Sequence, residues 1–165
     1  MESKKEQITC SQCDRGVDED NDFCPFCGSI FVDNVSCVNH NELNASGVCV
    51  ICCEPYCEKC GTNVNDIFLC EKHSEYEIYQ GMARVFGISD EAQAQYVKSC
   101  FEQEGLHPFI YSRKAGAWHM GSGDYTLFRA SGEYDGHIVN EIKVMVPLQE
   151  VLKAESILLE LDVSS

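Results

Sequence analysis

The stretch from Cys37 to His73 constrains this chain more than any other part of its sequence. It holds eight cysteine and histidine donors in four pairs, and two residues separate the donors within each pair. That spacing forms a tight turn that brings both donor atoms to one side of a tetrahedral ion. Two pairs complete one site, so four pairs predict two metal ions. The pairs are Cys37 and His40, Cys49 and Cys52, Cys57 and Cys60, and Cys70 and His73.

Disulfide bonds are the main alternative for a chain with twelve cysteines, of which eleven lie between Cys10 and Cys70. The N-terminus, Met-Glu-Ser-Lys-Lys-Glu-Gln, is charged and leads into no apolar run, so we expect no secretory signal. We therefore expect a reducing, cytoplasmic location, where thiols bind metal instead of pairing. No stretch approaches the roughly 18 apolar residues that a membrane span needs, so we expect no membrane association.

The charge of the chain bears on its partners. Its formal net charge is −15, and deprotonated ligands make zinc sites of four cysteines, or of three cysteines and one histidine, more negative still. Such a chain repels phosphate backbones, so we expect no nucleic-acid partner.

A second pattern precedes the central stretch. Residues 1–7 form a polar lead that we expect to be disordered, and residues 8–32 hold the pairs Cys10 and Cys13, and Cys24 and Cys27. Two close pairs across a short linker, with Gly28 after the last cysteine, predict a zinc site. The run Phe-Cys-Pro-Phe-Cys-Gly that ends at Gly28 resembles the short zinc ribbons of microbial proteins. A redox-active Cys-x2-Cys pair is the alternative.

The central stretch, residues 35–74, resembles a B-box-type zinc finger. In that family the ligands interleave in a cross-brace. The resemblance implies one zinc held by Cys37, His40, Cys57 and Cys60, and another held by Cys49, Cys52, Cys70 and His73. Spacing alone leaves sequential pairing open.

Cys53 stands where such modules usually carry a small non-ligand, often glycine. It is interpreted as a free thiol, with three roles open: a surplus buried cysteine, a redox-sensitive thiol or a substitute ligand. The ten cysteines and two histidines that remain supply three closed four-coordinate sites. They predict three structural zinc ions per chain and leave no position for catalytic water.

Residues 76–163 change character, because the cysteine pairs stop and periodic apolar patterns begin. Alternation predicts strands around Ala83–Phe86 and over Leu106–Ser112, and Asp135-Gly136 predicts a hairpin between Tyr125–Tyr134 and His137–Val146. A helix with Ser89 as N-cap is predicted to end at Gly105, and a second to begin at Pro147. Arg113–Gly123, with Trp118 and His119, is predicted to be a loop. The predicted core residues of the helices are Ala94, Val97, Cys100 and Phe101, then Val151, Ala154, Leu158 and Leu161.

This order predicts an α+β sandwich with helices on one face of a mainly antiparallel sheet. The stretch resembles a small signal-transducing domain of unknown biochemical function, which is ferredoxin-like in fold. The turn Glu102–Leu106, where helix gives way to strand, carries most of that resemblance.

No catalytic constellation accompanies these modules, since phosphate loops, nucleophile elbows and zinc-protease motifs are absent from the sequence. His107, His119 and His137 are scattered and are interpreted as surface or core histidines. We expect a non-enzymatic, zinc-binding adaptor or regulatory protein that binds a protein partner in signalling. One alternative is a redox- or metal-responsive sensor that uses Cys53 or labile zinc, and another is a small-molecule enzyme with a cleft near Trp118. Pairing of two copies into a homodimer through a sheet edge stays open.

Overall fold

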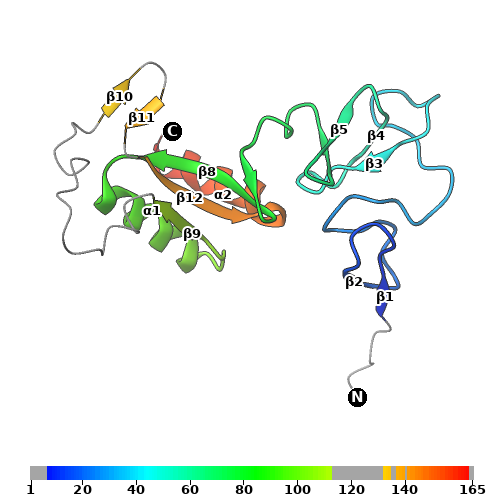
Figure 1. Cartoon of the computed structure of the whole chain (residues 1–165), viewed down its shortest axis with the longest axis horizontal. Coiled ribbons are helices and arrows are strands. Elements are labelled where there is room, and N and C mark those ends of the chain that lie inside the picture. The colour runs from blue at the N-terminus through cyan, green and yellow to red at the C-terminus, as the bar shows by residue number, and fades with distance from the viewer. Residues whose placement is uncertain (1–6, 113–131, 135–136, 140, 164–165) are drawn as a thin grey trace, which may run out of the picture. The chain divides into compact units, whose positions relative to one another are not determined.

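Short antiparallel hairpins build the N-terminal half of the chain, and a four-stranded sheet with two helices builds the C-terminal half (Figure 1). The computed structural model describes residues 7–112, 132–134, 137–139 and 141–163. Two units result, Met1–Tyr76 and Glu77–Ser165. The predicted loop Arg113–Gly123 and all but one residue of the predicted lead lie outside the described residues, whereas Gln7 lies in the first strand.

The first hairpin of the N-terminal unit pairs β1 (Gln7–Thr9) with β2 (Gly16–Asp18). Its core consists of Cys10, Cys24 and Cys27 around Val17, with Phe26 and Phe31 packed at the edge. Cysteines therefore fill the place that larger apolar side chains occupy in an ordinary core, and this module cannot bury enough apolar surface to fold on it alone.

Two more hairpins follow in the same unit. β3 (Gly47–Val48) pairs with β4 (Pro55–Tyr56), and β5 (Gly61–Val64) pairs with β6 (Ile67–Cys70). The strand predicted at Ile67–Leu69 to deliver Cys70 is confirmed. Asn65 and Asp66, both with positive φ, form the two-residue turn between β5 and β6, as tight hairpins favour.

Backbone hydrogen bonds join these hairpins to the first module. The Val48 N–H donates to the Gly28 carbonyl at 2.8 Å, and the Phe68 N–H donates to the Cys27 carbonyl at 2.9 Å. Gly28 has φ +81, and a Cβ there would lie 2.2 Å from the Val48 carbonyl oxygen and 2.9 Å from the Phe68 Cβ. Glycine is thus required twice over, by its left-handed backbone and by the close approach of two strands.

The C-terminal unit is organised by an antiparallel sheet in the order β7-β8-β12-β9. β12 pairs with both β8 and β9, which places it between two strands that are joined through α1. Both helices pack against the sheet and against each other, so the predicted α+β class is confirmed. The elements are β7 (Ile78–Tyr79), β8 (Met82–Ile88), α1 (Glu91–Gln103), β9 (Phe109–Ser112), β12 (Ile142–Pro147), the 3-10 turn η3 (Leu148–Glu150) and α2 (Val151–Glu160).

Helix α1 keeps three of its four predicted core residues, since Cys100 is half-buried, and it changes its predicted cap. Ala94, Val97 and Phe101 are buried. Asp90, not Ser89, is the N-cap, because its carboxylate accepts the Gln93 N–H at 2.9 Å and satisfies a donor of the first turn.

Helix α2 differs from expectation at both ends. Pro147 ends β12 and is followed by η3, so the α-helix begins only at Val151. Leu161, predicted as core, is half-buried, and Ile157 is buried in addition to the predicted residues. The helix ends at Glu160, so Leu161 lies at its C-cap.

The predicted strand Leu106–Ser112 is shorter than expected. The Leu106 N–H donates to the Phe101 carbonyl at the end of α1, and the His107 N–H donates to the Glu150 carboxylate. Pro108 has no N–H to donate. Ladder pairing therefore starts only at Phe109.

The hairpin predicted at Asp135-Gly136 is confirmed in its flanking residues, where Tyr134 pairs with His137. β10 (Gly132–Tyr134) and β11 (His137–Val139) form a two-stranded sheet of their own. The prediction of one continuous strand over His137–Val146 is therefore wrong. Its first residues pair with β10, and from Ile142 the chain pairs with β8 and β9 in the larger sheet.

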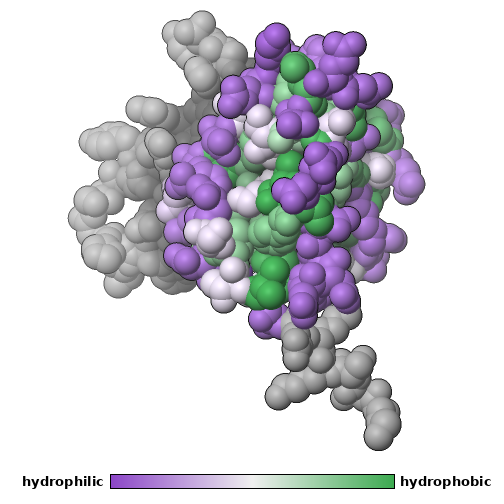
Figure 2. Space-filling view, turned by 90° about the vertical axis from the view of Figure 1, so that its right-hand side faces the viewer, coloured by the Kyte–Doolittle hydropathy of each residue, from purple (hydrophilic) through white to green (hydrophobic). Residues whose placement is uncertain are grey.

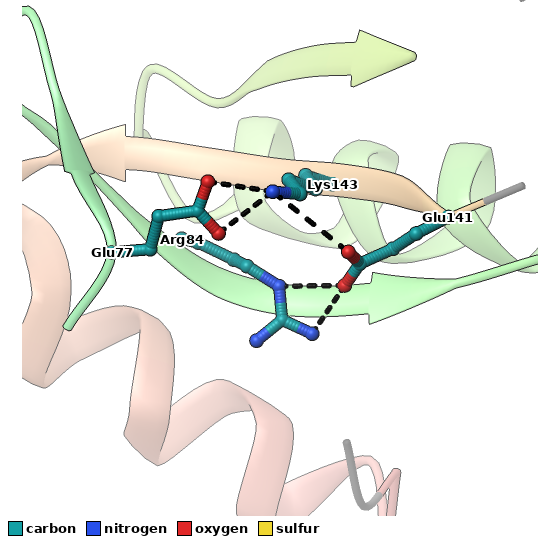
Figure 3. A network of polar contacts seen from close by, with 4 residues as sticks. All are labelled: Glu77, Arg84, Glu141 and Lys143. Carbon is teal, nitrogen blue, oxygen red and sulfur yellow. Dashed lines mark hydrogen bonds and ion pairs between the residues drawn. The ribbon is translucent and has the colours of Figure 1, made fainter. Parts of the chain in front are cut away.

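Four charged side chains link β8 and β12 on one face of the sheet (Figure 3). The Arg84 guanidinium pairs with Glu141, its Nε donating to Oε1 at 2.7 Å, and the Lys143 ammonium donates to both carboxylate oxygens of Glu77 at 2.6 and 2.7 Å. Lys143 stands 3.9 Å from Glu141, which joins the two pairs. The network balances two positive and two negative groups, and isolated exposed pairs of this kind add little stability. Phe86 and Val144, which pair across the same two strands, are buried in the core.

No helix of the described residues combines the length and the apolar character that crossing a bilayer requires.

The contact at Gly28 gives the first prediction. Gly28→Ala should destabilise the metal-loaded N-terminal unit by more than the roughly 1–2 kcal/mol that left-handed strain alone costs, because the new methyl group meets backbone atoms that cannot move aside. Gly81→Ala is the matched control, since Gly81 also has a positive φ but nothing lies within 4 Å of its added Cβ. Thermal unfolding followed through amide signals of each unit measures both costs. Equal costs would contradict the tight junction.

Candidate metal centres

Twelve cysteine and histidine side chains gather in three groups of four. Within each group one donor atom from every residue lies within 4.8 Å of the others. The structure thus holds three Cys/His tetrads able to bind metal ions. The first tetrad is Cys10, Cys13, Cys24 and Cys27, the second is Cys37, His40, Cys57 and Cys60, and the third is Cys49, Cys52, Cys70 and His73.

Backbone turns place the donors of the first tetrad. The Asp14 N–H donates to the Cys10 carbonyl, and the Gly28 N–H donates to the Cys24 carbonyl, each at 2.9 Å. Both turns end on a residue with positive φ, 56° at Asp14 and 81° at Gly28. The sulfur of Cys10 then lies 3.7 Å from that of Cys27, and the sulfur of Cys13 lies 3.6 Å from that of Cys24.

The second and third tetrads interleave along the chain. His40 Nδ1 faces three sulfurs, at 3.8 Å from Cys37, 3.5 Å from Cys57 and 3.2 Å from Cys60. The third tetrad takes its donors from the pair before Cys57 and the pair after Cys60, so each tetrad combines donor pairs that are not neighbours in sequence. The sequential pairing that spacing left open is not the arrangement observed.

In the third tetrad the imidazole lies deeper. His73 Nδ1 stands 3.4 Å from the Cys49 sulfur and 3.2 Å from the Cys70 sulfur, and His73 is only 3% exposed. His40, in contrast, is exposed, and Cys60 beside it is half-buried. The second tetrad is therefore the most open to solvent of the three.

The donor distances fit zinc. A tetrahedral ion with bonds of about 2.3 Å to sulfur separates two sulfurs by roughly 3.8 Å, and a shorter bond to imidazole nitrogen brings nitrogen and sulfur slightly closer. The separations above, 3.2 to 3.8 Å, match this. Thiolate with imidazole is the donor set that zinc prefers, and four protein donors complete its structural coordination.

The electrostatics of the thiols also favours a cation. Burial raises the pKa of the Cys37 thiol, but the backbone N–H groups of Cys57 and Asn39 donate to its sulfur, and the pKa falls to about 6. Burial in the first tetrad raises the pKa of Cys24 to about 12, and in the third it raises the pKa of Cys52 to about 12. Thiols of such different acidity are all deprotonated together only when a metal ion balances their charge.

Polar groups beside the ligands were not found by sequence reasoning. The Ser29 hydroxyl lies 3.1 Å from the Cys27 sulfur, and the Tyr56 hydroxyl lies 3.8 Å from the Cys52 sulfur while it donates to Glu54 at 2.9 Å. Hydrogen bonds from such neighbouring groups fix the orientation of metal ligands. Ser29 follows Cys27 by two residues and Tyr56 follows Cys52 by four, so a search around each pair for hydroxyl groups could have found them.

Cys53 belongs to none of the tetrads and is exposed, so its interpretation as a buried cysteine is wrong. The reason is local: the Cys53 N–H donates to the Cys49 carbonyl at 2.8 Å, and φ is 59°. Cys53 thus ends its turn as Gly28 does, in a conformation that turns its side chain outward. All twelve cysteines are free, and Cys100, predicted as core, is half-buried.

The three tetrads include none of the other three histidines. His107 is exposed, and its ring Nδ1 lies 2.7 Å from the Glu150 carboxylate. His137 lies in β11, and His119 lies outside the described residues.

A recess lies where the first module packs on the β5–β6 hairpin. Its volume is about 390 Å³, and half of the residues that line it are polar, namely Gln12, Ser29, Ser46, Asn63 and Asp66. Trp118, around which a cleft was expected, lies outside the described residues. The recess belongs to the metal-binding unit.

Comparison of the chain with family models, curated proteins and solved structures found no match in any of the three. What can be said of these centres therefore rests on their own geometry and chemistry.

Metal stoichiometry tests the three tetrads directly. The chain purified without chelator should carry three zinc ions, and Cys57→Ser should lower the number to two, because a tetrad with three donors binds zinc far more weakly. Cys53→Ser is the matched control and should retain three. Native mass spectrometry counts the ions. A loss of zinc from the Cys53 variant would show that this thiol is a ligand.

The tetrads should also differ in lability. Because His40 is exposed while His73 is buried, a chelator should remove metal from the second tetrad before the third. Amide signals of Asn39 and Val50, which adjoin the second and third tetrads, follow the two losses during titration of the zinc-loaded chain. Loss in the reverse order, or of both together, would contradict the link between exposure and exchange.

Proposed function

We propose that the protein is a non-enzymatic, zinc-binding adaptor or regulatory protein that presents its metal-stapled unit to a protein partner in cytoplasmic signalling. The observation that carries the proposal is closure of the sites: each tetrad supplies four protein donors, and a catalytic zinc needs a position for water or substrate. Rigid zinc modules without chemistry of their own serve as binding surfaces.

The finer identity of the modules belongs to the same proposal. Residues 8–32 are a zinc ribbon, and residues 35–74 are a B-box-type cross-brace finger. The interleaved donor pairs of the second and third tetrads support the finger assignment. Redox exchange by the first pairs finds less support, because four sulfurs meet there instead of two.

For the C-terminal unit we propose the ferredoxin-like signal-transducing domain. Support comes from the split unit β8-α1-β9 with β12 between its strands, the arrangement that defines this fold. One departure is clear in the described residues: β7, which precedes β8, occupies the sheet edge that in βαββαβ topology belongs to the strand after the second helix.

A sensor that uses Cys53 is the second candidate, since its thiol is exposed beside a tetrad. Burial of the sulfur, and then the charge of Cys49, raise the pKa of Cys53, which disfavours the reactive thiolate. If Cys53 nevertheless senses oxidants, mild peroxide should release zinc more slowly from Cys53→Ser than from the wild type. Equal rates would remove this candidate.

The adaptor proposal is tested by affinity capture with zinc retained, followed by reconstitution from purified proteins. A partner should bind the zinc-loaded chain directly. Cys57→Ser should weaken that binding, because the turns that carry the donors of the second tetrad are no longer held together by a metal ion. Cys53→Ser should bind as the wild type does. Absence of any direct partner, together with turnover of a small molecule by the purified chain, would overturn the proposal.

A further inference from the structure

Three large apolar side chains stand exposed within one short segment of the metal-binding unit. Val32 and Val38 are each 44% exposed, and Leu43 is 39% exposed. Figure 2 shows apolar residues gathering in a band across a face of the molecule. Exposed apolar side chains that are scattered singly need no explanation, but a group of them rimmed by polar residues marks an interaction site.

This segment is held in place by its backbone and by the second tetrad. The Cys37 N–H donates to the Leu43 carbonyl at 2.9 Å, and the Leu43 N–H donates to the His40 carbonyl at 2.9 Å. The Val38 N–H donates to the Pro55 carbonyl at 3.0 Å. Val38 and Leu43 therefore lie in the turn from Cys37 to Leu43, here called the knuckle, which also carries His40. A metal ion bound there would fix the apolar side chains in one arrangement.

The segment that carries this knuckle bears charge of a single sign, whereas the exposed Lys59 lies between Cys57 and Cys60, the other donor pair of the same tetrad. Between Arg15 and Lys59 the sequence contains no lysine or arginine. The same interval holds eight carboxylates, and those nearest the knuckle are exposed. The tetrads add further negative charge when their thiolates bind zinc. The acidic residues are Asp18, Glu19, Asp20, Asp22, Asp33, Glu42, Glu54 and Glu58.

We propose that Val32, Val38 and Leu43, with the rim of Asp33 and Glu42, form a docking surface, here called the knuckle surface, for a basic amphipathic segment of a protein partner. Apolar anchors of that segment would cover the exposed side chains, and flanking lysines or arginines would face the acidic rim. The inference rests on the proposed adaptor function and adds to it the surface that is used and the chemistry of the partner.

Charge complementarity decides between the occupants of such a surface. A second copy of this chain carries the same net charge of −15, so it would bring acidic groups against acidic groups. Nucleic acid and anionic lipid are repelled for the same reason. A cationic segment with apolar anchors can cover the exposed apolar side chains and also place positive charge against the acidic rim.

A designed peptide provides the test on the full-length, zinc-loaded chain. The peptide is a synthetic helix with leucines on one face and lysines on the other. One companion replaces every lysine by glutamate, and another replaces every leucine by serine. Fluorescence anisotropy measures affinity, and amide shifts locate the binding. The lysine–leucine peptide should bind with shifts around Val38 and Leu43, and both companions should bind at least about tenfold more weakly.

Two variants separate this surface from general attraction to an acidic chain. Val38→Ser with Leu43→Ser should weaken the peptide about tenfold or more, whereas Leu159→Ser, which alters an 83% exposed apolar residue of α2, should leave affinity unchanged. Asp33→Lys with Glu42→Lys should weaken the lysine peptide and strengthen the glutamate peptide. This charge exchange keeps the test decisive even if the serine variant folds poorly.

Each result has a definite meaning. Shifts elsewhere, equal weakening by Leu159→Ser, or no effect of the charge exchange would overturn the knuckle surface. If the partner found by affinity capture binds the Val38 and Leu43 variant as well as the wild type, the surface fails while the adaptor function stands. If neither peptide nor partner binds, the adaptor function fails as well.

Discussion

Three tetrads of cysteine and histidine, each able to bind a metal ion, are the feature on which we expect the order of the N-terminal unit to depend. Around the first tetrad the buried residues are three cysteines and Val17, and the larger side chains of Phe26 and Phe31 are only partly buried against them. Apolar burial of that size cannot offset the entropy of ordering the segment. A structural zinc site contributes on the order of 10 kcal/mol to folding, which is comparable with the whole stability of an ordinary domain. The sulfurs therefore act both as the core of the module and as its cross-links.

Interleaving makes the centres mutually dependent. The segment between Cys49 and Cys60 supplies donors to the third tetrad and then to the second, so displacement of either metal disturbs the support of the other. Phe68 extends this dependence to the first module. It is buried in β6, and its N–H donates to the carbonyl of Cys27, which belongs to the first tetrad. The three tetrads thus share no donor residue, but backbone segments and their hydrogen bonds connect them.

Sequence reasoning succeeded where a local rule fixes the geometry. Two-residue spacing gives the donor pairs, and helical periodicity gives Ala94, Val97 and Phe101 as core. It failed where the outcome depends on competition between distant groups. The Glu150 carboxylate accepts the His107 N–H, so β9 begins later in the chain than predicted. The predicted strand His137–Val146 is divided between two sheets, because its two parts pair with different strands. Spacing likewise could not choose between interleaved and sequential tetrads, because both satisfy every local turn.

The two units are stable for different physical reasons, and this difference bears on function. The C-terminal unit buries Phe86, Phe101 and Leu148 between sheet and helices, and none of the tetrads draws a ligand from it. The N-terminal unit instead holds the three tetrads, and the metal ions that they can bind are ones that the cell can supply or withdraw. The most exposed tetrad carries the knuckle surface, so the element most sensitive to metal is also the one that presents exposed valine and leucine. Metal supply can therefore govern the proposed docking surface while the sheet and helices of the other unit keep their packing.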